Sequence, residues 1–362
     1  MADIALAPET PALPPTQKGR SRGGTTLWRY VLVRFLLIFP TIFILVTTVF
    51  LMMRVTGDPI TAALGGQLTP AQLAERISAA GYDRPLFVQY VEYLGSVLRG
   101  DFGTTIDGQP VTGVLLRYGG ATLELAFYAL IVAFVVGIPL GMLAAALRDR
   151  WGDAVLRIFA ILCYATPVFF AGLLLKLVFS SWLGILPSSG RASPRVELAL
   201  NRIDGATGIY TIDAIRTGNP FIIGDVLQHA LLPGLALGLL TAGVFLRLVR
   251  TNVIGTLQMP YIDAARSRGV SEFRLVRTHA YRPALIPIIT VIGLQIAMLL
   301  GGAVLTETTF EWMGLGFQLS EFLKARDFVA VQGIVALLAV IVALTNFVVD
   351  IIAAFIDPRV RY

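Results

Sequence analysis

Polar residues interrupt the strongly apolar runs of this chain, and they are its first candidates for chemistry. They are Glu124 near the start of one run, Lys176 deeper in the next, Gln295 in the middle of a third, and Glu307 just after that run. Ionisable and amide groups cost free energy in lipid. Each of them therefore either lines a path for a polar ligand or holds neighbouring helices together.

The two interpretations carry different weight at each position. Glu124 can contact a positively charged group of a ligand, or it can be a helix-terminal acid that reaches toward water. Lys176 can face an internal cavity or extend its ammonium group to the membrane surface. For Gln295 a bond to a neighbouring helix is favoured over a place in a path. Glu307 can form a gate, or it can cap the segment that follows it.

Motifs for enzymatic catalysis are missing from the sequence. It contains no G-x-x-x-x-G-K-[ST] phosphate-binding loop, no H-E-x-x-H zinc motif and no G-x-S-x-G nucleophile turn. Its two histidines, His229 and His279, are far apart and are expected on opposite sides of a membrane. Cys163, the single cysteine, lies in an apolar run and is interpreted as a small core residue. The sequence therefore predicts no catalytic, cofactor-binding or metal site in this chain.

Residues 259–274 form a cationic segment between two apolar runs, and their spacing predicts a short helix, a tight turn and a second helix. Pro260 suits the first helical position, where its missing N–H would be unpaired in any case. Asp263 falls in the first turn, where the helix dipole favours negative charge. Gly269 can leave the helix in a left-handed conformation, and Ser271 can cap the next helix. Spacing alone also fits an ordinary amphipathic loop between membrane spans.

The same segment resembles the EAA loop of permease subunits from ABC importers. The matching residues are Asp263-Ala264-Ala265 with Gly269, followed by Leu285-Ile286-Pro287. Asp263 stands where the family name calls for Glu, but residues 261–269 fit the local form of the peptide permeases, Tyr-hydrophobic-x-x-Ala-Arg-x-basic-Gly. The resemblance implies a coupling helix that docks into an ATP-binding subunit. It assigns this contact to Tyr261, Asp263, Ala264, Ala265, Arg266, Gly269, Glu272 and Arg274.

Further motifs in family order resemble the B-type subunit of the dipeptide and oligopeptide branch. They are residues 83–90, 98–103, 278–287 and 302–310, and Asp357-Pro358-Arg359. Met313-Gly314 departs from the family, which usually has Pro before this Gly. The resemblance covers roughly residues 28–362. It implies the type I importer permease fold and makes a peptide amino group the ligand group that Glu124 would contact.

Composition independently indicates an all-α polytopic membrane protein. The chain has 362 residues, of which 56% are hydrophobic and 14% charged, and its mean hydropathy is +0.75. A soluble domain has about 25% charged residues. Helices are expected because unpaired backbone groups in lipid cost several kcal/mol each. The net charge of +6 is typical of cytosolic anchoring rather than of nucleic-acid binding.

Apolar runs predict six spans and divide the chain into four parts. Spans are expected at about 30–53, 121–147, 155–183, 230–250, 284–306 and 331–356. The parts are a disordered cytosolic tail (1–27), transmembrane helix 1 (28–53), an external subdomain (54–120) and a core permease domain (121–362) with helices 2–6 and the cytosolic coupling loop 251–283. A signal peptide is the alternative for the tail, but the run after it is too long and has no convincing cleavage site.

Lysine and arginine set the expected orientation. With the N-terminus inside, 17 of these residues lie on cytosolic segments and 11 on longer external ones, while Lys176 falls within a span. This asymmetry follows the positive-inside rule and predicts that both termini and the loop 251–283 are cytosolic.

The sequence as a whole predicts a multi-pass permease of the bacterial inner membrane that imports dipeptides or short oligopeptides. The resemblance implies these partners: a second homologous permease subunit, two ATP-binding subunits that hold ATP and Mg²⁺, an external substrate-binding protein, and membrane lipid. The alternative is a secondary transporter or channel without an ATPase, which predicts paired inverted repeats in the hydropathy. An intramembrane enzyme is a third possible class, and the absence of a recognisable nucleophile–base pair or metal-ligand set in the sequence argues against it.

Overall fold

The structure is a computed structural model that describes residues 23–55, 57–66 and 68–356. Residues 1–22 of the expected tail and the Asp357-Pro358-Arg359 motif lie outside the described residues. Within them every regular element is a helix, and strand pairing is limited to one isolated bridge between Thr104 and Pro110. The prediction of an all-α protein is confirmed.

The long helices match the six predicted spans. They are α1 (Gly23–Val55), α5 (Val111–Val132) continuing through η1 (Ala133–Gly137) into α6 (Ile138–Ala146), the pair α7 (Trp151–Ala165) and α8 (Val168–Leu175) with η2 (Lys176–Trp182), α11 (Pro220–Leu257), α14 (Tyr281–Phe310) and α16 (Phe328–Ile356). Four of the described helices, 28–55, 111–146, 220–257 and 328–352, are long and apolar enough to cross a bilayer, and the bent pair 151–182 is a fifth candidate. α14 has 30 residues and packs against α11 and α16.

The start of the second span differs from the expected one. The second spanning helix begins at Val111, directly after the extended Pro110, so that residues 111–120 belong to it and not to the external subdomain. Gly120 lies inside this helix. A Cβ there would lie 2.9 Å from the Gly208 carbonyl oxygen, so the small residue allows a close contact.

The third expected span, 155–183, is not one straight helix. α7 and α8 meet at an angle of 106°, and Thr166 between them is extended, with φ −76° and ψ 127°. Proline disfavours the helical conformation of the residue before it, so Pro167 accounts for the break at Thr166.

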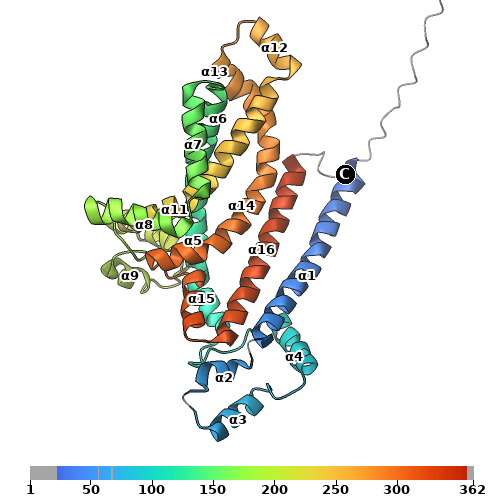
Figure 1. Ribbon diagram of the computed structural model, residues 1–362, viewed down its shortest axis with the longest axis vertical. Helices are drawn as coiled ribbons and strands as arrows, with labels where there is room; N and C mark the ends of the chain where they lie inside the picture. The colour runs from blue at the N-terminus through green and yellow to red at the C-terminus, as the bar shows by residue number, and fades with distance from the viewer. Residues whose placement is uncertain (1–22, 56, 67, 357–362) are drawn as a thin grey trace, which may run out of the picture.

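Shorter helices lie at the two ends of the molecule (Figure 1). α2 (Pro59–Leu64), α3 (Pro70–Ala79) and α4 (Leu86–Leu98) gather at one end, and α12 (Pro260–Ser267) and α13 (Glu272–Arg274) at the other. α9 (Pro194–Leu200) and α10 (Tyr210–Thr217) precede α11, and α15 (Leu315–Lys324) joins α14 to α16. The start of α1 lies close to the end of α16.

α11 is the central helix of the core, packing against α5, α6, α7 and α14. Glycines bring these helices together at short distance. A Cβ at Gly238 would lie 2.6 Å from the Val132 Cβ, and one at Gly243 would lie 2.7 Å from the Ala160 carbonyl oxygen. Small residues at such crossings allow the backbone contact that drives helix association in lipid.

Candidate functional site

Local sequence rules account for the shape of the loop that holds α12. Pro260 occupies the first turn of the helix, and the extended Met259 precedes it. After the helix, the Gly269 N–H donates to the Arg266 carbonyl at 2.9 Å, and the Val270 N–H donates to the Ala265 carbonyl at 3.3 Å. These two bonds form a Schellman motif, which satisfies carbonyls that the end of the helix leaves free.

Gly269 has a φ of +78°, as the sequence predicts. No heavy atom lies within 4 Å of the position that a Cβ would take there. A side chain at this position would therefore meet backbone strain and not a clash. That strain is about 1–2 kcal/mol for a non-glycine residue in the left-handed region.

Arg266 joins the two helices of the loop across the turn. Its Nε donates to Glu272 at 2.6 Å and its Nη1 donates to Asp263 at 2.7 Å, while all three side chains stay solvent-exposed. The hydrogen bond to Glu272 and the charge of that residue raise the pKa of Arg266, with Asp263 adding to the effect. The guanidinium is therefore fully charged but already paired within its own loop.

One side of α12 is bound into the protein core. Ile262 has no exposed surface and belongs to a cluster with Leu275 and Val276 of the segment η3 (Leu275–Ala280), Phe245, Val249 and Val253 of α11, and Ala284 and Ile288 of α14. Ala265 is half-buried against the same cluster, whereas Ala264 is exposed. The two alanines of the predicted motif therefore face different surroundings.

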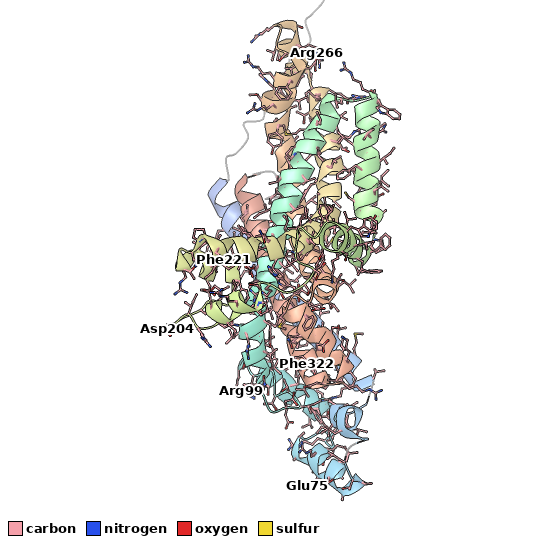
Figure 2. All side chains as sticks on the ribbon, turned by 90° about the vertical axis from the view of Figure 1, so that its left-hand side faces the viewer. Glu75, Arg99, Asp204, Phe221, Arg266 and Phe322 are labelled. Carbon is pink, nitrogen blue, oxygen red and sulfur yellow. The ribbon has the colours of Figure 1, made fainter. Side chains whose placement is uncertain are left out.

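The other side of the loop presents large side chains to solvent. Phe273 is 67% exposed, and Met259 and Tyr261 are about half exposed. Arg268 and Arg274 are exposed beside them. Ser271 precedes α13 as predicted but makes no side-chain capping bond. Aromatic residues, Met and Arg are the types enriched at protein–protein interfaces, and this surface is the outermost part of the molecule at its end (Figure 2).

Glu124 forms a buried ion pair near the opposite end of the spans. Its Oε2 accepts from Arg191 at 2.6 Å, and its Oε1 accepts from the Thr211 N–H at 2.6 Å and from the Thr211 hydroxyl. The Arg191 guanidinium also stacks 3.7 Å from the Tyr210 ring centroid. The carboxylate thereby ties α5 to α10 and to the segment before α9.

Glu307 is fully buried near the end of α14. It accepts from the Thr122 hydroxyl at 2.7 Å and from the Phe317 N–H at 2.8 Å. Phe317 is in the first turn of α15, so the carboxylate caps the following helix, which is one of the two alternatives expected from the sequence. A Cβ at Gly314 would lie 2.5 Å from this carboxylate, which explains a glycine there.

Lys176 and Gln295 are separate from these two networks. The Lys176 ammonium donates to the Thr309 carbonyl at 2.8 Å, in the last turn of α14, where the helix dipole favours a cation. Gln295 is buried in the middle of α14. The structure thus distributes the four polar residues over several places and does not gather them into one site.

Several residues that pack α12 against the core or pair with Glu124 were missed in the sequence analysis. Val270, which follows the turn glycine, could have been assigned, because a hydrophobic contact after such a turn is a general feature of the motif. Ile262 could have been assigned as the one large aliphatic residue in a short polar helix. Arg191 carried no signal, since nothing in a sequence pairs it with a glutamate 67 positions away.

A membrane-transport family model matches most of this chain. The description "binding-protein-dependent transport system inner membrane component" matches residues 137–362, and the N-terminal model of the same systems matches residues 27–114. The chain belongs to this family. It is a multi-pass permease of the inner membrane, and permeases of this family work with ATPase and substrate-binding partners.

Individual relatives cover nearly the whole chain. The probable D,D-dipeptide transport system permease protein DdpB of Escherichia coli (strain K12) is 39% identical over 84% of this chain and 89% of its own length. The dipeptide transport system permease protein DppB of the same strain is 36% identical over 92% of this chain and 99% of its own. The fold resembles a solved inward-facing structure of the MetNI methionine ABC transporter, with a TM-score of 0.50 and 17% identity over 68% of this chain and 97% of that one.

Proposed function

We propose that this chain is the membrane-spanning subunit of an ATP-driven importer of dipeptides or short oligopeptides. It forms the translocation path with a second, homologous permease subunit. Two ATP-binding subunits hold ATP and Mg²⁺ and carry out hydrolysis, and an external substrate-binding protein delivers the cargo. The peptide cargo is supported by the names of the two relatives, both of which are dipeptide permeases.

The observation that carries the proposal is the construction of α12. The helix lies at one end of the molecule, its inner side is bound into the core through Ile262, and its outer side exposes Ala264 between large side chains. A short helix with a small residue at its exposed centre can enter a groove of another protein. The pairing of Arg266 within the loop keeps the helix and the turn in one geometry before any partner arrives.

The proposal assigns this surface to the cytosol, on the same side of the membrane as the start of α1 and the end of α16. In Figure 1 the start of α1 and the end of α16 lie together, on the side opposite to α2 and α3. This arrangement agrees with the lysine and arginine asymmetry of the sequence.

The polar residues in the spans have different parts in the proposed path. Glu124 and Glu307 fix the helices around its external end through the bonds described above. Lys176 holds the end of α14. Gln295 lies at mid-span, the depth at which a path-lining residue would meet the cargo.

Transport by the assembled complex tests the proposal. The chain is reconstituted in liposomes with the second permease subunit and the two ATP-binding subunits of the proposed complex, and the binding protein is loaded with radiolabelled L-alanyl-L-alanine. We expect uptake only when ATP and Mg²⁺ are on the ATPase side. Uptake of the dipeptide by the chain alone, without ATP, would instead support a secondary transporter.

The alanine pair sharpens this test. We expect Ala264→Trp to abolish uptake and co-purification of the ATPases while the permease keeps its thermal stability, because the indole fills the docking surface. Ala265→Trp should lower stability, because that residue packs on the core. Ala71→Trp, on the exposed surface of external α3, is the matched control and should transport normally. Wild-type uptake by Ala264→Trp would exclude α12 as the docking element.

A further inference from the structure

The helix α4 is apolar but too short to cross a membrane. Its 13 residues extend about 20 Å at 1.5 Å per residue, whereas the hydrocarbon core of a bilayer is about 30 Å thick. α4 lies beside the end of α1, and α2 and α3 lie farther from the long helices (Figure 1). The apolar residues of α4 therefore need an environment other than a membrane crossing of their own.

Two faces of α4 have clear surroundings. One packs on the protein, where Gln89 is buried and Tyr90 and Tyr93 are half-buried. The second is polar and exposed, with Glu92 on the helix and Arg99 directly after it. These two residues are seven positions apart, so they lie on the same side of the helix.

The third face is an exposed apolar stripe made of Phe87, Val91, Leu94 and Leu98. Phe87 is 76% exposed, Val91 52% and Leu98 87%, and Leu94 is half-buried. Steps of four, three and four residues keep all four side chains on one side of the helix. A protein–protein interface carries hydrogen bonds as well as apolar contacts, but no side chain of this stripe can form one. Lipid acyl chains require none.

Contacts with α1 place α4 at the level of the last turns of that span. The Tyr90 hydroxyl is 2.6 Å from the Thr47 hydroxyl, and the rings of Tyr90 and Tyr93 have their centroids 5.2 Å and 5.5 Å from that of Phe50. Thr47 and Phe50 precede Val55, the last residue of α1, by about 12 Å and 8 Å along the helix axis. Helices that lie in a membrane surface bury their apolar face about 5–10 Å deep, so α4 is at a suitable depth.

The lipid-facing surface of α1 continues at this same level. Leu51, Met52 and Val55 are all exposed, and they belong to the apolar span 28–55. Leu51 and Met52 directly follow Phe50, which α4 contacts. The stripe of α4 therefore adjoins apolar side chains that the membrane itself covers.

We propose that α4 is an interfacial helix that lies in the bilayer surface at the end of α1 opposite to α12. Its apolar stripe inserts among the acyl chains of that leaflet, and Glu92 and Arg99 face water. α4 is then a second membrane contact for the end of α1, in addition to the span itself. The inference rests on α1 being a membrane span and is independent of the cargo and of the ATPase.

Spin labels on the two exposed faces test this placement. In a Cys163→Ala background, Val91→Cys and Leu98→Cys carry a nitroxide on the stripe, and Glu92→Cys and Arg99→Cys are matched controls on the polar face. The full-length chain is studied in liposomes, alone and assembled with the subunits of the proposed complex. Electron paramagnetic resonance measures collisions of each label with oxygen, which concentrates in lipid, and with a water-soluble nickel chelate.

We expect the ratio of oxygen to nickel collisions to be several-fold higher at Val91 and Leu98 than at Glu92 and Arg99, both in the chain alone and in the complex. Equal ratios at all four positions would show that the stripe faces water and would overturn the proposal. Loss of collisions with both reagents at Val91 and Leu98 in the complex would also overturn it, because another protein would then cover the stripe.

Discussion

At the scale of single residues, Gly269 shows how a local rule fixes the position of an exposed helix. Its positive φ and the two bonds around it turn the chain back, so that Val270 and Ala265 both reach the core below α12. The direction of α12 therefore depends on one backbone conformation that glycine adopts without strain.

Replacement of that glycine should separate coupling from stability. We expect Gly269→Val to abolish ATP-dependent uptake and to destabilise the chain by only about 1–2 kcal/mol, because the strain is confined to one exposed turn. Gly205→Val is the matched control, since Gly205 also has a positive φ of +67° with no atom within 4 Å of its Cβ position, and it lies in the loop between α9 and α10, far from α12 in sequence. Uptake in liposomes measures the coupling of both variants, and thermal unfolding measures their stability. Equal uptake by the two would show that the turn at Gly269 is not needed for coupling.

At the scale of helices, an ion pair connects α7 to α11. Asp153 has no exposed side-chain surface and accepts from the Arg250 Nε at 2.6 Å and Nη2 at 2.7 Å, with Arg157 at 3.7 Å. Such a fork-to-fork pair fixes the relative position of the two helices as well as their distance.

Loss of Asp153 should leave a partly buried charge on Arg250 without its partner. We expect Asp153→Asn to cost about 1–3 kcal/mol of stability, because the partly exposed Arg250 then loses its charged partner. The pair Arg148 and Asp149 is exposed, so Arg148→Gln should cost less than about 1 kcal/mol and serves as the control. The midpoint of unfolding, followed by tryptophan fluorescence in detergent, measures both. A loss for Asp153→Asn no greater than for the control would show that the buried pair does not stabilise the α7–α11 contact.

Helices were predicted from the sequence far better than their contacts. The six spans were predicted because hydropathy is averaged over many consecutive residues. The turn at Gly269 was predicted because its rules involve only a few neighbouring positions. The break at Thr166 and the start of α5 at Val111 are also local effects of proline, but apolar composition continues across them and concealed them. The Glu124–Arg191 pair depends on folding of distant segments, for which one sequence carries no signal.

At the scale of the whole molecule, the two ends differ in construction. One end carries α12 and α13 with Arg266 at its tip, and the other carries α2, α3 and α4 with Glu75 at its tip (Figure 2). A protein that receives cargo on one side of a membrane and energy on the other needs two such different surfaces.

Labelling of single cysteines should confirm which end faces the cytosol. In a Cys163→Ala background, we expect Glu75→Cys and Asp204→Cys to react with an impermeant maleimide in intact spheroplasts. Both residues are exposed, Glu75 at the end of the molecule opposite to Arg266 and Asp204 on the segment between α9 and α10, and both lie in segments predicted to be external. Ser267→Cys should react only after lysis. Efficient labelling of Ser267→Cys alone in sealed spheroplasts would invert the orientation.

The burial of Ile262 in the same cluster as Phe245 and Leu275 has a mechanical consequence. Protein interiors have low compressibility and transmit strain. A displacement of α12 would therefore move the adjoining ends of α11 and α14 with it, because the side chains of the three helices pack directly against each other. Deformation would occur instead at the bend at Thr166 and in η2 (Lys176–Trp182), which lie outside this cluster and where the regular helical bonding is interrupted.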